Sequence, residues 1–233
     1  MKNIAIILSG GVGSRMRSEI PKQYIEINSK PIALYSIETF LRNKTIDSIV
    51  IIVADEWKCY MEKTLSHLNP DKAIYYATSG ETRQYSIYNG LLEAKRRGAK
   101  DDDIVIIHDA ARPLVSEFLI DSCIAGCKEA DGVLPVVPVK DTLYQSKDGC
   151  NITSLLNRSE LFAGQAPEAF KFGLYLGLHE SISHEELLKI NGSTEIAYKG
   201  GLKIKMIRGE ERNFKITTPE DLSNFESIVM NTK

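Results

Sequence analysis

The residues with the clearest chemical potential are glycines, serines and cations close to the N-terminus. The chain runs Leu8-Ser9-Gly10-Gly11-Val12-Gly13-Ser14-Arg15-Met16 and continues shortly afterwards with Pro21-Lys22-Gln23. Glycines let backbone N–H groups come close to an anionic ligand, and the side chains of Arg15 and Lys22 can meet phosphate oxygens. This combination indicates phosphate binding of the kind used in nucleotide chemistry.

The spacing of this segment excludes two common phosphate loops. A P-loop carries Lys and then Ser or Thr directly after its last glycine, whereas Gly13 is followed by Ser14 and Arg15. A dinucleotide fingerprint requires glycine or alanine where Met16 stands. For the segment taken alone, an ordinary turn between a strand and a helix remains the alternative.

A carboxylate follows a second apolar run. Ile104-Val105-Ile106-Ile107 predicts a buried strand, and His108-Asp109-Ala110-Ala111-Arg112-Pro113 comes directly after it. A carboxylate at the carboxyl end of a strand can hold Mg²⁺ alongside phosphate oxygens. The alternative is that Asp109 caps a turn and that Arg112 is merely its ion-pair partner. We expect His108 to be held by a hydrogen bond rather than to act as a general base.

Two further polar clusters follow predicted strands. In Gly80-Glu81-Thr82-Arg83-Gln84-Tyr85-Ser86, Gly80 permits close approach and Ser86 lies one turn inside a helix, so the cluster could recognise a base edge. A glycine-initiated helix with solvated charges is the alternative. Near the C-terminus, Asn213 and Lys215 alternate with Phe214 and therefore point to one face, which could equally be a solvated strand face.

The elements that must hold these clusters alternate between strands and helices. Short apolar runs, which predict buried strands, occur at Ile4–Leu8, Ser48–Ala54, Ile104–Ile107 and Val133–Val137. Helix-length segments lie at Thr82–Gly98, at Ser116–Ala130 and after Pro31, which suits the first position of a helix. This alternation predicts a mostly parallel sheet whose ligands bind at the carboxyl ends of the strands.

We expect a single domain over residues 1–233, interrupted by one inserted arm. Residues 140–165 are polar, contain Gly149 and Asn151, and lack a helical apolar stripe. The alternation in Leu202–Ile207 then predicts a half-exposed strand. A last helix should begin at Thr218-Pro219, with a capping threonine, a proline at the first position and acids in the first turn.

Charge and hydropathy exclude several classes of partner. The 233 residues carry a formal net charge of −2, so the protein has no overall basic field and we expect no nucleic-acid partner. No apolar run approaches the ~20 residues that span a bilayer, and the N-terminus passes directly into a strand. We therefore expect a cytoplasmic protein without a membrane partner. The four cysteines form no C-x-x-C pair and are expected to be core thiols rather than a metal site.

Taken together, these clusters resemble the 2-C-methyl-D-erythritol 4-phosphate cytidylyltransferase family, which includes the D-ribitol-5-phosphate cytidylyltransferases. The resemblance is collinear over almost the whole chain, through GGVGSRM, PKQY, GETRQYS, HDAARP, VPVKDT, NRSEL, GQAPEAF and NFKITTPEDL. It implies a Rossmann-like nucleotidyltransferase fold, a three-layer α/β sandwich with a mostly parallel sheet. It also implies a homodimer in which a protruding dimerisation arm, at about residues 138–165, completes the partner's site.

The resemblance further implies a role for each matching residue. CTP would be bound by Ser9, Gly10, Gly11, Gly13, Ser14, Gly80, Arg83 and Ser86. The catalytic cations would be Arg15, Lys22 and Lys215. The polyol phosphate would be contacted by Asp109, Arg112, Thr142, Arg158 and Thr194, with Thr142 and Arg158 supplied by the other subunit. Asp109 would hold Mg²⁺, with Asn213 as a second metal or phosphate contact.

The implied reaction is attack of a substrate phosphate on the α-phosphorus of CTP, with release of pyrophosphate. Fixed cations and Mg²⁺ would neutralise the repulsion between the two anions, and an ionised phosphate nucleophile needs no general base. We expect 2-C-methyl-D-erythritol 4-phosphate to be converted to 4-diphosphocytidyl-2-C-methyl-D-erythritol for isoprenoid biosynthesis. The alternative is D-ribitol 5-phosphate, giving CDP-ribitol for cell-surface polymers.

The chain departs from the family pattern where the polyol phosphate should bind. The usual T-P-Q is Ala166-Pro167-Glu168, the usual T-D-(D/E) is Thr194-Glu195-Ile196, and Arg212 replaces an acid. These changes could mark a different polyol phosphate or drift at positions that do not touch it.

Two other classes of protein are alternatives to a cytidylyltransferase. Nucleotide-sugar glycosyltransferases usually carry Asp-x-Asp for their metal, whereas this strand ends in His108-Asp109-Ala110. A catalytically inactive nucleotide-binding module would have no reason to keep four charged residues together, namely Arg15, Lys22, Asp109 and Lys215.

Overall fold

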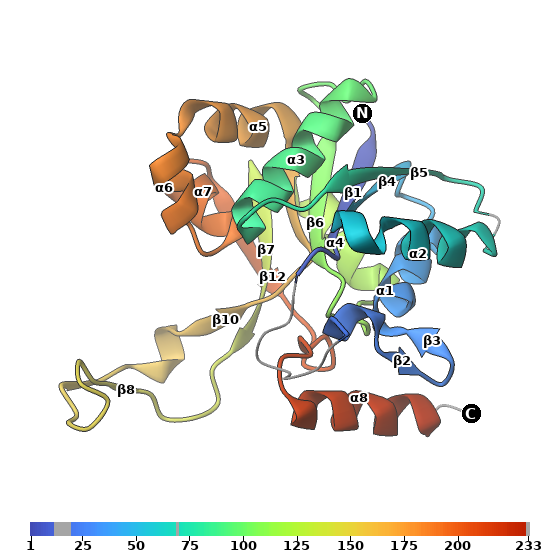
Figure 1. The fold of residues 1–233 in the computed structure, drawn as a ribbon. Coiled ribbons are helices and arrows are strands. Elements are labelled where there is room, and N and C mark those ends of the chain that lie inside the picture. The colour runs from blue at the N-terminus through green and yellow to red at the C-terminus, as the bar shows by residue number, and fades with distance from the viewer. Residues whose placement is uncertain (12–19, 69, 232–233) are drawn as a thin grey trace.

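The computed structural model describes residues 1–11, 20–68 and 70–231. Within these residues the central sheet contains β1 (Asn3–Leu8), β4 (Ser48–Val53), β5 (Ala73–Thr78), β6 (Ile104–Asp109), β7 (Gly132–Pro138), β10 (Phe162–Gly164), β11 (Glu168–Lys171) and β12 (Ile204–Arg208). Their order is β10-β7-β11-β6-β1-β4-β5, and β12 also pairs with β7 (Figure 1).

The half of the sheet that carries the N-terminal clusters is parallel, as the sequence predicts. β1 lies between β4 and β6 in parallel register, and β5 extends the sheet beyond β4. Leu8 is therefore level with Ile52 and with Asp109, so the segments that follow these strands leave the sheet at one edge. The other half differs from a purely parallel sheet, because β11 runs antiparallel to both β6 and β7.

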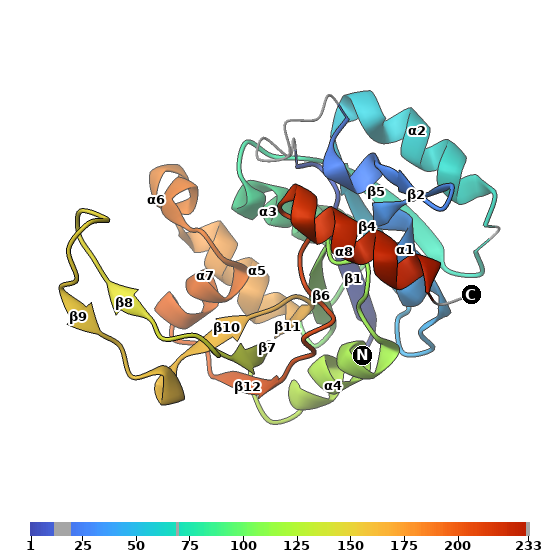
Figure 2. The same cartoon turned by 90° about the horizontal axis from the view of Figure 1, so that it is seen from below.

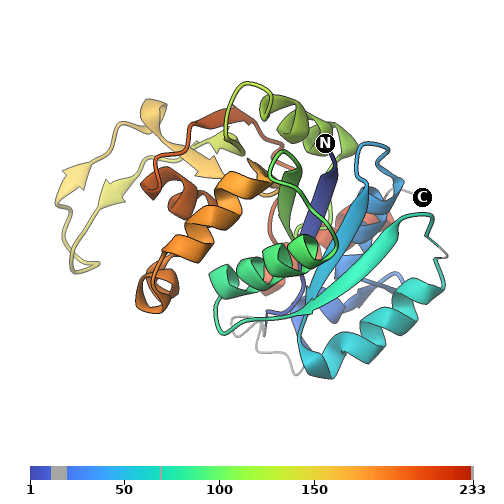
Figure 3. The ribbon, with the colours of Figure 1, turned by 90° about the horizontal axis from the view of Figure 1, so that it is seen from above.

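Helices cover both faces of the sheet, which gives three layers (Figure 3). One face packs against α1 (Ile32–Arg42), α2 (Asp55–Ser66) and α4 (Glu117–Gly126). The other packs against α3 (Arg83–Arg96), α5 (Phe172–Ser181), α6 (His184–Lys189) and α7 (Ser193–Lys199). Strand residues alternate between the two cores: Ala5 and Ile7 belong to the first, Ile4 and Ile6 to the second. Burial on both faces explains why these strands are continuously apolar.

Three predicted helix starts are confirmed by their capping hydrogen bonds. The hydroxyl groups of Thr82, Ser116 and Thr218 each accept a hydrogen bond from a backbone N–H in the first turn of α3, α4 and α8 (Pro219–Met230). Pro219 occupies the start of α8 as expected. The expectation for Pro31 is wrong by one position: Pro31 precedes α1 as its N-cap and belongs to the short strand β3 (Lys30–Pro31), paired with β2 (Glu26–Ile27).

The polar insertion forms an extension that leaves the body of the protein between β7 and β10 (Figure 2). This arm, residues 139–161, contains the strand pair β8 (Tyr144–Gln145) and β9 (Ser154–Leu155) and a short 3₁₀ turn at Arg158–Glu160. Large apolar side chains of the arm are exposed, among them Tyr144, Ile152 and Leu155.

The cysteine and membrane predictions have mixed outcomes. Cys123 and Cys127 are buried as expected, but Cys59 and Cys150 are exposed, so the expectation of core thiols is wrong for these two. Cys59 lies on α2, which buries only part of its circumference, and Cys150 lies in the arm. Among the residues described, no helix is both long enough and apolar enough to cross a membrane.

Candidate active site

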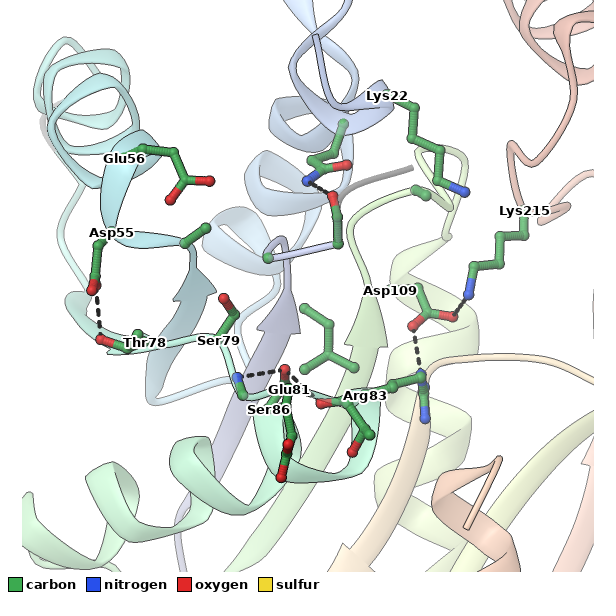
Figure 4. A pocket seen from close by; sticks show the side chains of 18 residues that line it. Lys22, Asp55, Glu56, Thr78, Ser79, Glu81, Arg83, Ser86, Asp109 and Lys215 are labelled. Carbon is green, nitrogen blue, oxygen red and sulfur yellow. Dashed lines mark hydrogen bonds and ion pairs between the residues drawn. The ribbon is translucent and has the colours of Figure 1, made fainter. Parts of the chain in front are cut away.

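A cavity of about 600 Å³ lies where the chain leaves the carboxyl ends of β1, β4, β5 and β6 (Figure 4). Its walls come from the four clusters identified in the sequence together with the start of α2. The predicted site residues that line it are Gly10, Gly11, Lys22, Gly80, Arg83, Ser86, Asp109 and Lys215. The fold therefore brings residues from positions 10 to 215 to one place.

The loop after β1 is held from below by side chains of the following turn. The Gln23 amide group donates hydrogen bonds to the carbonyl oxygens of Ser9 and Gly11, both at 2.7 Å. The Tyr24 hydroxyl group also donates to the Ser9 carbonyl, at 2.8 Å. Gly10 is required by close approach, because a Cβ atom there would lie 2.3 Å from Cβ of Ser79. The loop after β1 and the loop after β5 are therefore in direct contact.

The second glycine cluster makes a tight turn into α3. The Gly80 N–H donates to Oγ of Ser86 at 3.0 Å, and this hydroxyl group donates to the Thr82 carbonyl, also at 3.0 Å. A Cβ atom on Gly80 would lie 2.3 Å from Cβ of Tyr85 and 2.9 Å from the backbone nitrogen of Ser86. Only glycine fits this turn.

Asp109 is the centre of a cluster of charges at the end of β6. Its carboxylate accepts hydrogen bonds from Nε of Arg83 at 3.1 Å and from Nζ of Lys215 at 2.9 Å. Nε of Arg112 lies 3.9 Å away. Burial opposes ionisation of this group, but the three cations together hold the pKa of Asp109 well below its usual range. Asp109 is therefore ionised at neutral pH.

Arg83 connects this carboxylate to a second one. Its Nη2 lies 3.8 Å from Oε1 of Glu168, and its Nη1 donates to Oγ of Ser193 at 2.5 Å. Oε2 of Glu168 accepts a hydrogen bond of 2.6 Å from the Thr194 hydroxyl group. Burial raises the pKa of Glu168, while the charge of Arg83 and the bond from Thr194 act in the opposite direction. The Asp109 cluster is thus linked to the first turn of α7.

Several lining residues were not anticipated from the sequence. Lys22 was predicted, and its ammonium group lines the cavity and donates a hydrogen bond to the Ile216 carbonyl oxygen at 2.6 Å. Two acidic residues of the wall were not predicted. Across the cavity lie Asp55 and Glu56, at the start of α2. The sequence could have indicated them, since they directly follow the predicted strand ending at Ala54. The carboxyl end of that strand lies at the same edge of the sheet as the ends of β1 and β6.

His108 is buried and hydrogen-bonded, as expected. Its Nε2 lies 3.1 Å from the Arg112 carbonyl oxygen, and burial lowers the pKa of His108 to about 4. The ring is therefore neutral at neutral pH, and it faces the backbone rather than the cavity.

The other predicted site residues within the described ranges do not line the cavity. Arg112 and Asn213 lie just behind it, where Nη1 of Arg112 donates to the Asn213 carbonyl and the Asn213 amide donates to the Ala166 carbonyl. Ser9 is buried beneath the loop. Thr142 and Arg158 lie exposed in the arm, where Nη1 of Arg158 donates to the Lys140 carbonyl at 2.9 Å. Gly13, Ser14 and Arg15 lie outside the described residues.

Asp109 is the carboxylate that the sequence analysis predicts as a ligand for Mg²⁺. Over residues 1–11, 20–68 and 70–231, no group of three or more His, Cys, Asp or Glu residues could hold a metal ion. Mg²⁺ usually needs only one or two carboxylates, because substrate phosphates and water supply its other ligands. An ionised Asp109 on the cavity wall fits that requirement. Oδ1 of Asn213 is buried without a hydrogen-bond partner, but its amide group is turned toward Ala166.

A glycine-lined cavity that gathers fixed cations around the Asp109 carboxylate, at the carboxyl edge of this α/β sheet, is the arrangement of a nucleotidyltransferase. The family model described as 2-C-methyl-D-erythritol 4-phosphate cytidylyltransferase matches residues 3–231. The chain belongs to this family, and it is a cytidylyltransferase. The family assignment decides against the glycosyltransferase and the inactive binding module.

Individual relatives carry two different acceptor names. A 2-C-methyl-D-erythritol 4-phosphate cytidylyltransferase of Clostridium botulinum (strain Eklund 17B / Type B) is 39% identical over 97% of this chain and 98% of its own length. A ribitol-5-phosphate cytidylyltransferase of Streptococcus agalactiae serotype V is 32% identical over 98% and 95%, respectively. The fold matches the crystal structure of 4-diphosphocytidyl-2C-methyl-D-erythritol synthase from Anaerococcus prevotii, with a TM-score of 0.82, 26% identity and coverage of 98% and 96%.

Proposed function

We propose that this enzyme transfers the cytidylyl group of CTP to 2-C-methyl-D-erythritol 4-phosphate and releases pyrophosphate. The observation that carries the proposal is the convergence of Lys22, Arg83 and Lys215 with the Asp109 carboxylate on one glycine-lined cavity. Two anions have to meet in this reaction, and negative charge then grows on the oxygens of the α-phosphate. Cations fixed in advance stabilise that charge without reorganising during the reaction.

The glycine turns are proposed to bind the nucleotide. Gly10 and Gly11 are proposed to approach the triphosphate with their backbone, and apart from its chain neighbours no described residue lies within 4 Å of the Cβ position of Gly11. Gly80 and Ser86 are proposed to bind the cytosine, since their turn faces the same cavity. The amino group of cytosine donates hydrogen bonds, and the Ser86 oxygen can accept one, because it receives one bond from the Gly80 N–H and has a second lone pair.

The cations are proposed to act on the phosphates. The ammonium groups of Lys22 and Lys215 both face the cavity, and Lys215 is held in place by Asp109 (Figure 4). An ionised phosphate nucleophile carries no proton that must be removed, so the neutral and buried His108 has no part in proton transfer. Mg²⁺ bound at Asp109 would supply further charge neutralisation on the phosphates.

The alternative acceptor is D-ribitol 5-phosphate. Glu168 is a departure from the usual family pattern close to the cavity, since it lies 3.8 Å from Arg83, and such a departure fits a changed acceptor. The relative with the ribitol name is also similar over nearly the whole chain. We place 2-C-methyl-D-erythritol 4-phosphate first because of the higher identity to the relative of that name.

A homodimer is proposed to complete the site. Thr142 and Arg158 lie in an arm that extends away from the cavity of its own chain, and exposed apolar side chains accompany them (Figures 2 and 3). Exposed Tyr144, Ile152 and Leu155 would be covered if the arm packed against a second copy. Arg158 could then bind the phosphate of the polyol in the partner's site.

Pyrophosphate release with CTP and Mg²⁺ tests the proposal directly. The purified protein is assayed with 2-C-methyl-D-erythritol 4-phosphate, with D-ribitol 5-phosphate and with D-erythritol 4-phosphate as a matched control that lacks the methyl group. A kcat/KM at least about tenfold higher for the first substrate, or about 1.4 kcal/mol, supports the proposal. Preference for the ribitol compound establishes the alternative, and no release with any of them contradicts both.

A further inference from the structure

Glu168 is a buried carboxylate placed beside the strand that carries Asp109. It is the first residue of β11 and stands opposite Ile107 of β6, two residues before Asp109. Only 7% of the residue is exposed. It does not line the cavity, so it acts on a substrate only through the groups that contact it: Arg83 on one side and Thr194 on the other.

The hydrogen bond to Glu168 determines which hydrogen bonds the Thr194 hydroxyl group can make to a substrate. A threonine hydroxyl group has one hydrogen atom to donate and two lone pairs to accept with. The 2.6 Å bond to Oε2 of Glu168 uses that hydrogen atom, because the Thr194 hydroxyl group donates in this contact and the carboxylate oxygen accepts. The oxygen of Thr194 therefore has only lone pairs left for a substrate. It can accept from an O–H group but cannot donate to a phosphate.

We propose that Glu168 is a positioning residue that turns Thr194 into a hydrogen-bond acceptor for a hydroxyl group of the polyol, rather than a donor to its phosphate. This inference rests on the proposed polyol phosphate substrate and names which end of it meets Thr194. Thr194 is partly exposed at the start of α7 and directly follows Ser193, which accepts a hydrogen bond from Arg83 of the cavity wall. The polyol chain, not its phosphate, then lies against α7.

A glutamine at position 168 would reverse this polarity. Arg83 has only N–H groups to offer, so the oxygen of a glutamine amide would turn toward Nη2 of Arg83. Its NH₂ group would then face Thr194 and donate to it. The threonine hydrogen atom would be released and could bond to a phosphate. The usual family pattern has glutamine here. Glu168 therefore changes whether the Thr194 hydroxyl group can donate its hydrogen atom to a substrate.

The test separates the two ends of the substrate. Pentyl phosphate keeps the phosphate and a five-carbon chain but has no hydroxyl group, and its Ki is measured as a competitive inhibitor against the polyol phosphate at saturating CTP. Thr194→Val deletes the hydroxyl group and keeps the shape. We expect it to raise the KM of the polyol phosphate about three- to tenfold, the effect of one lost neutral hydrogen bond, and to leave the Ki of pentyl phosphate within about twofold.

The same change is then made together with Glu168→Gln. In that background Thr194→Val should raise the Ki of pentyl phosphate about three- to tenfold, because the released hydrogen atom had been bound to the phosphate. Comparing the two changes within one background cancels the effect of the lost charge at position 168. Thr194→Ser, which keeps the hydroxyl group, is the matched control, and Thr194→Ala replaces valine if the valine variant does not fold.

The outcomes distinguish this inference from the proposed function. If Thr194→Val raises the KM of the polyol phosphate and the Ki of pentyl phosphate equally in the wild-type background, Thr194 donates to the phosphate and the inference is overturned alone. If neither value changes, Thr194 does not contact the substrate, and the inference is again overturned. If the wild-type protein releases no pyrophosphate with any polyol phosphate, both are overturned.

Discussion

Replacing Asp109 with asparagine is the most informative single perturbation of the cavity. Asp109→Asn keeps the shape of the side chain but leaves Arg83, Arg112 and Lys215 without their shared anion. Removing one partner of a fully buried ion pair destabilises a protein by about 3–5 kcal/mol. The side chains of Arg83 and Lys215 are 28% and 31% exposed, so solvent screens them and we expect about 2 kcal/mol.

Thermal unfolding measures this loss. For a domain of this size, about 2 kcal/mol corresponds to a Tm lower by roughly 4–8 °C. The folded-state pKa of Asp109 is depressed, so its contribution is fully present above the ordinary pKa of aspartate, about 3.9, and is lost as pH falls toward the folded-state value. The Tm difference between wild type and Asp109→Asn should therefore be constant between about pH 5 and 8 and shrink below about pH 4.

Activity gives the second measurement. If Asp109 holds Mg²⁺, the Mg²⁺ concentration for half-maximal pyrophosphate release should rise at least about tenfold in Asp109→Asn, or about 1.4 kcal/mol. Asp131→Asn is the matched control. It removes a carboxylate whose Oδ1 lies 2.9 Å from Nζ of Lys171, and neither residue lines the cavity. An unchanged Mg²⁺ titration in a folded Asp109→Asn protein would refute the metal assignment, and an unchanged Tm would refute the electrostatic reasoning.

Three further predictions address the other parts of the site. Lys22→Ala should lower kcat about 10²–10³-fold with a smaller effect on CTP binding, because its charge opposes one that grows in the transition state; near-normal kcat would remove Lys22 from the catalytic residues. Gly80→Ala should raise the KM for CTP at least about fivefold, because its methyl group meets backbone atoms of the next turn. Gly177→Ala is the control, because outside its own helix no residue that the structure describes lies within 4 Å of the new Cβ, and equal KM values in the two variants would contradict the close approach. Arg158→Ala should raise the KM of the polyol phosphate more than that of CTP, and mixing it with Lys22→Ala chains should restore one site per heterodimer. Mixed dimers as inactive as both parents would show that Arg158 does not serve the neighbouring subunit.

The parallel half of the sheet was predictable because its strands are buried on both faces. Ile4–Leu8 and Ile104–Ile107 have no polar residue to interrupt them, and the structure extends each by one or two residues only. The segments after these strands could therefore be assigned to one edge of the sheet. That single inference predicts that Gly10, Lys22 and Asp109 lie at one edge of the sheet, and all three line the cavity.

What the sequence could not predict depends on contacts between distant segments. β11 has only four residues, and its antiparallel pairing with β6 is set by the return of the arm rather than by a local pattern. The ion pairs of Arg83 join positions 26 and 85 residues apart, which no spacing rule reveals. Glu168 was recognisable as a departure from the family pattern, but its contact with Thr194 required the packing of α7 against the sheet.

The amide group of Gln23 connects the proposed nucleotide-binding loop to the entropy of loop closure. It bonds to the carbonyl oxygen of Gly11, 12 positions earlier in the chain, and so joins the two ends of the segment between them. Bringing the ends of a 12-residue loop together lowers chain entropy by an amount equivalent to roughly 2.2 kcal/mol plus a constant. Because Gln23 holds these ends together in the folded protein, this entropy is lost during folding, before any nucleotide is present. In the proposed binding mode, part of the affinity for CTP is therefore determined by folding, and a shorter side chain at position 23 would transfer that entropy loss to the binding step.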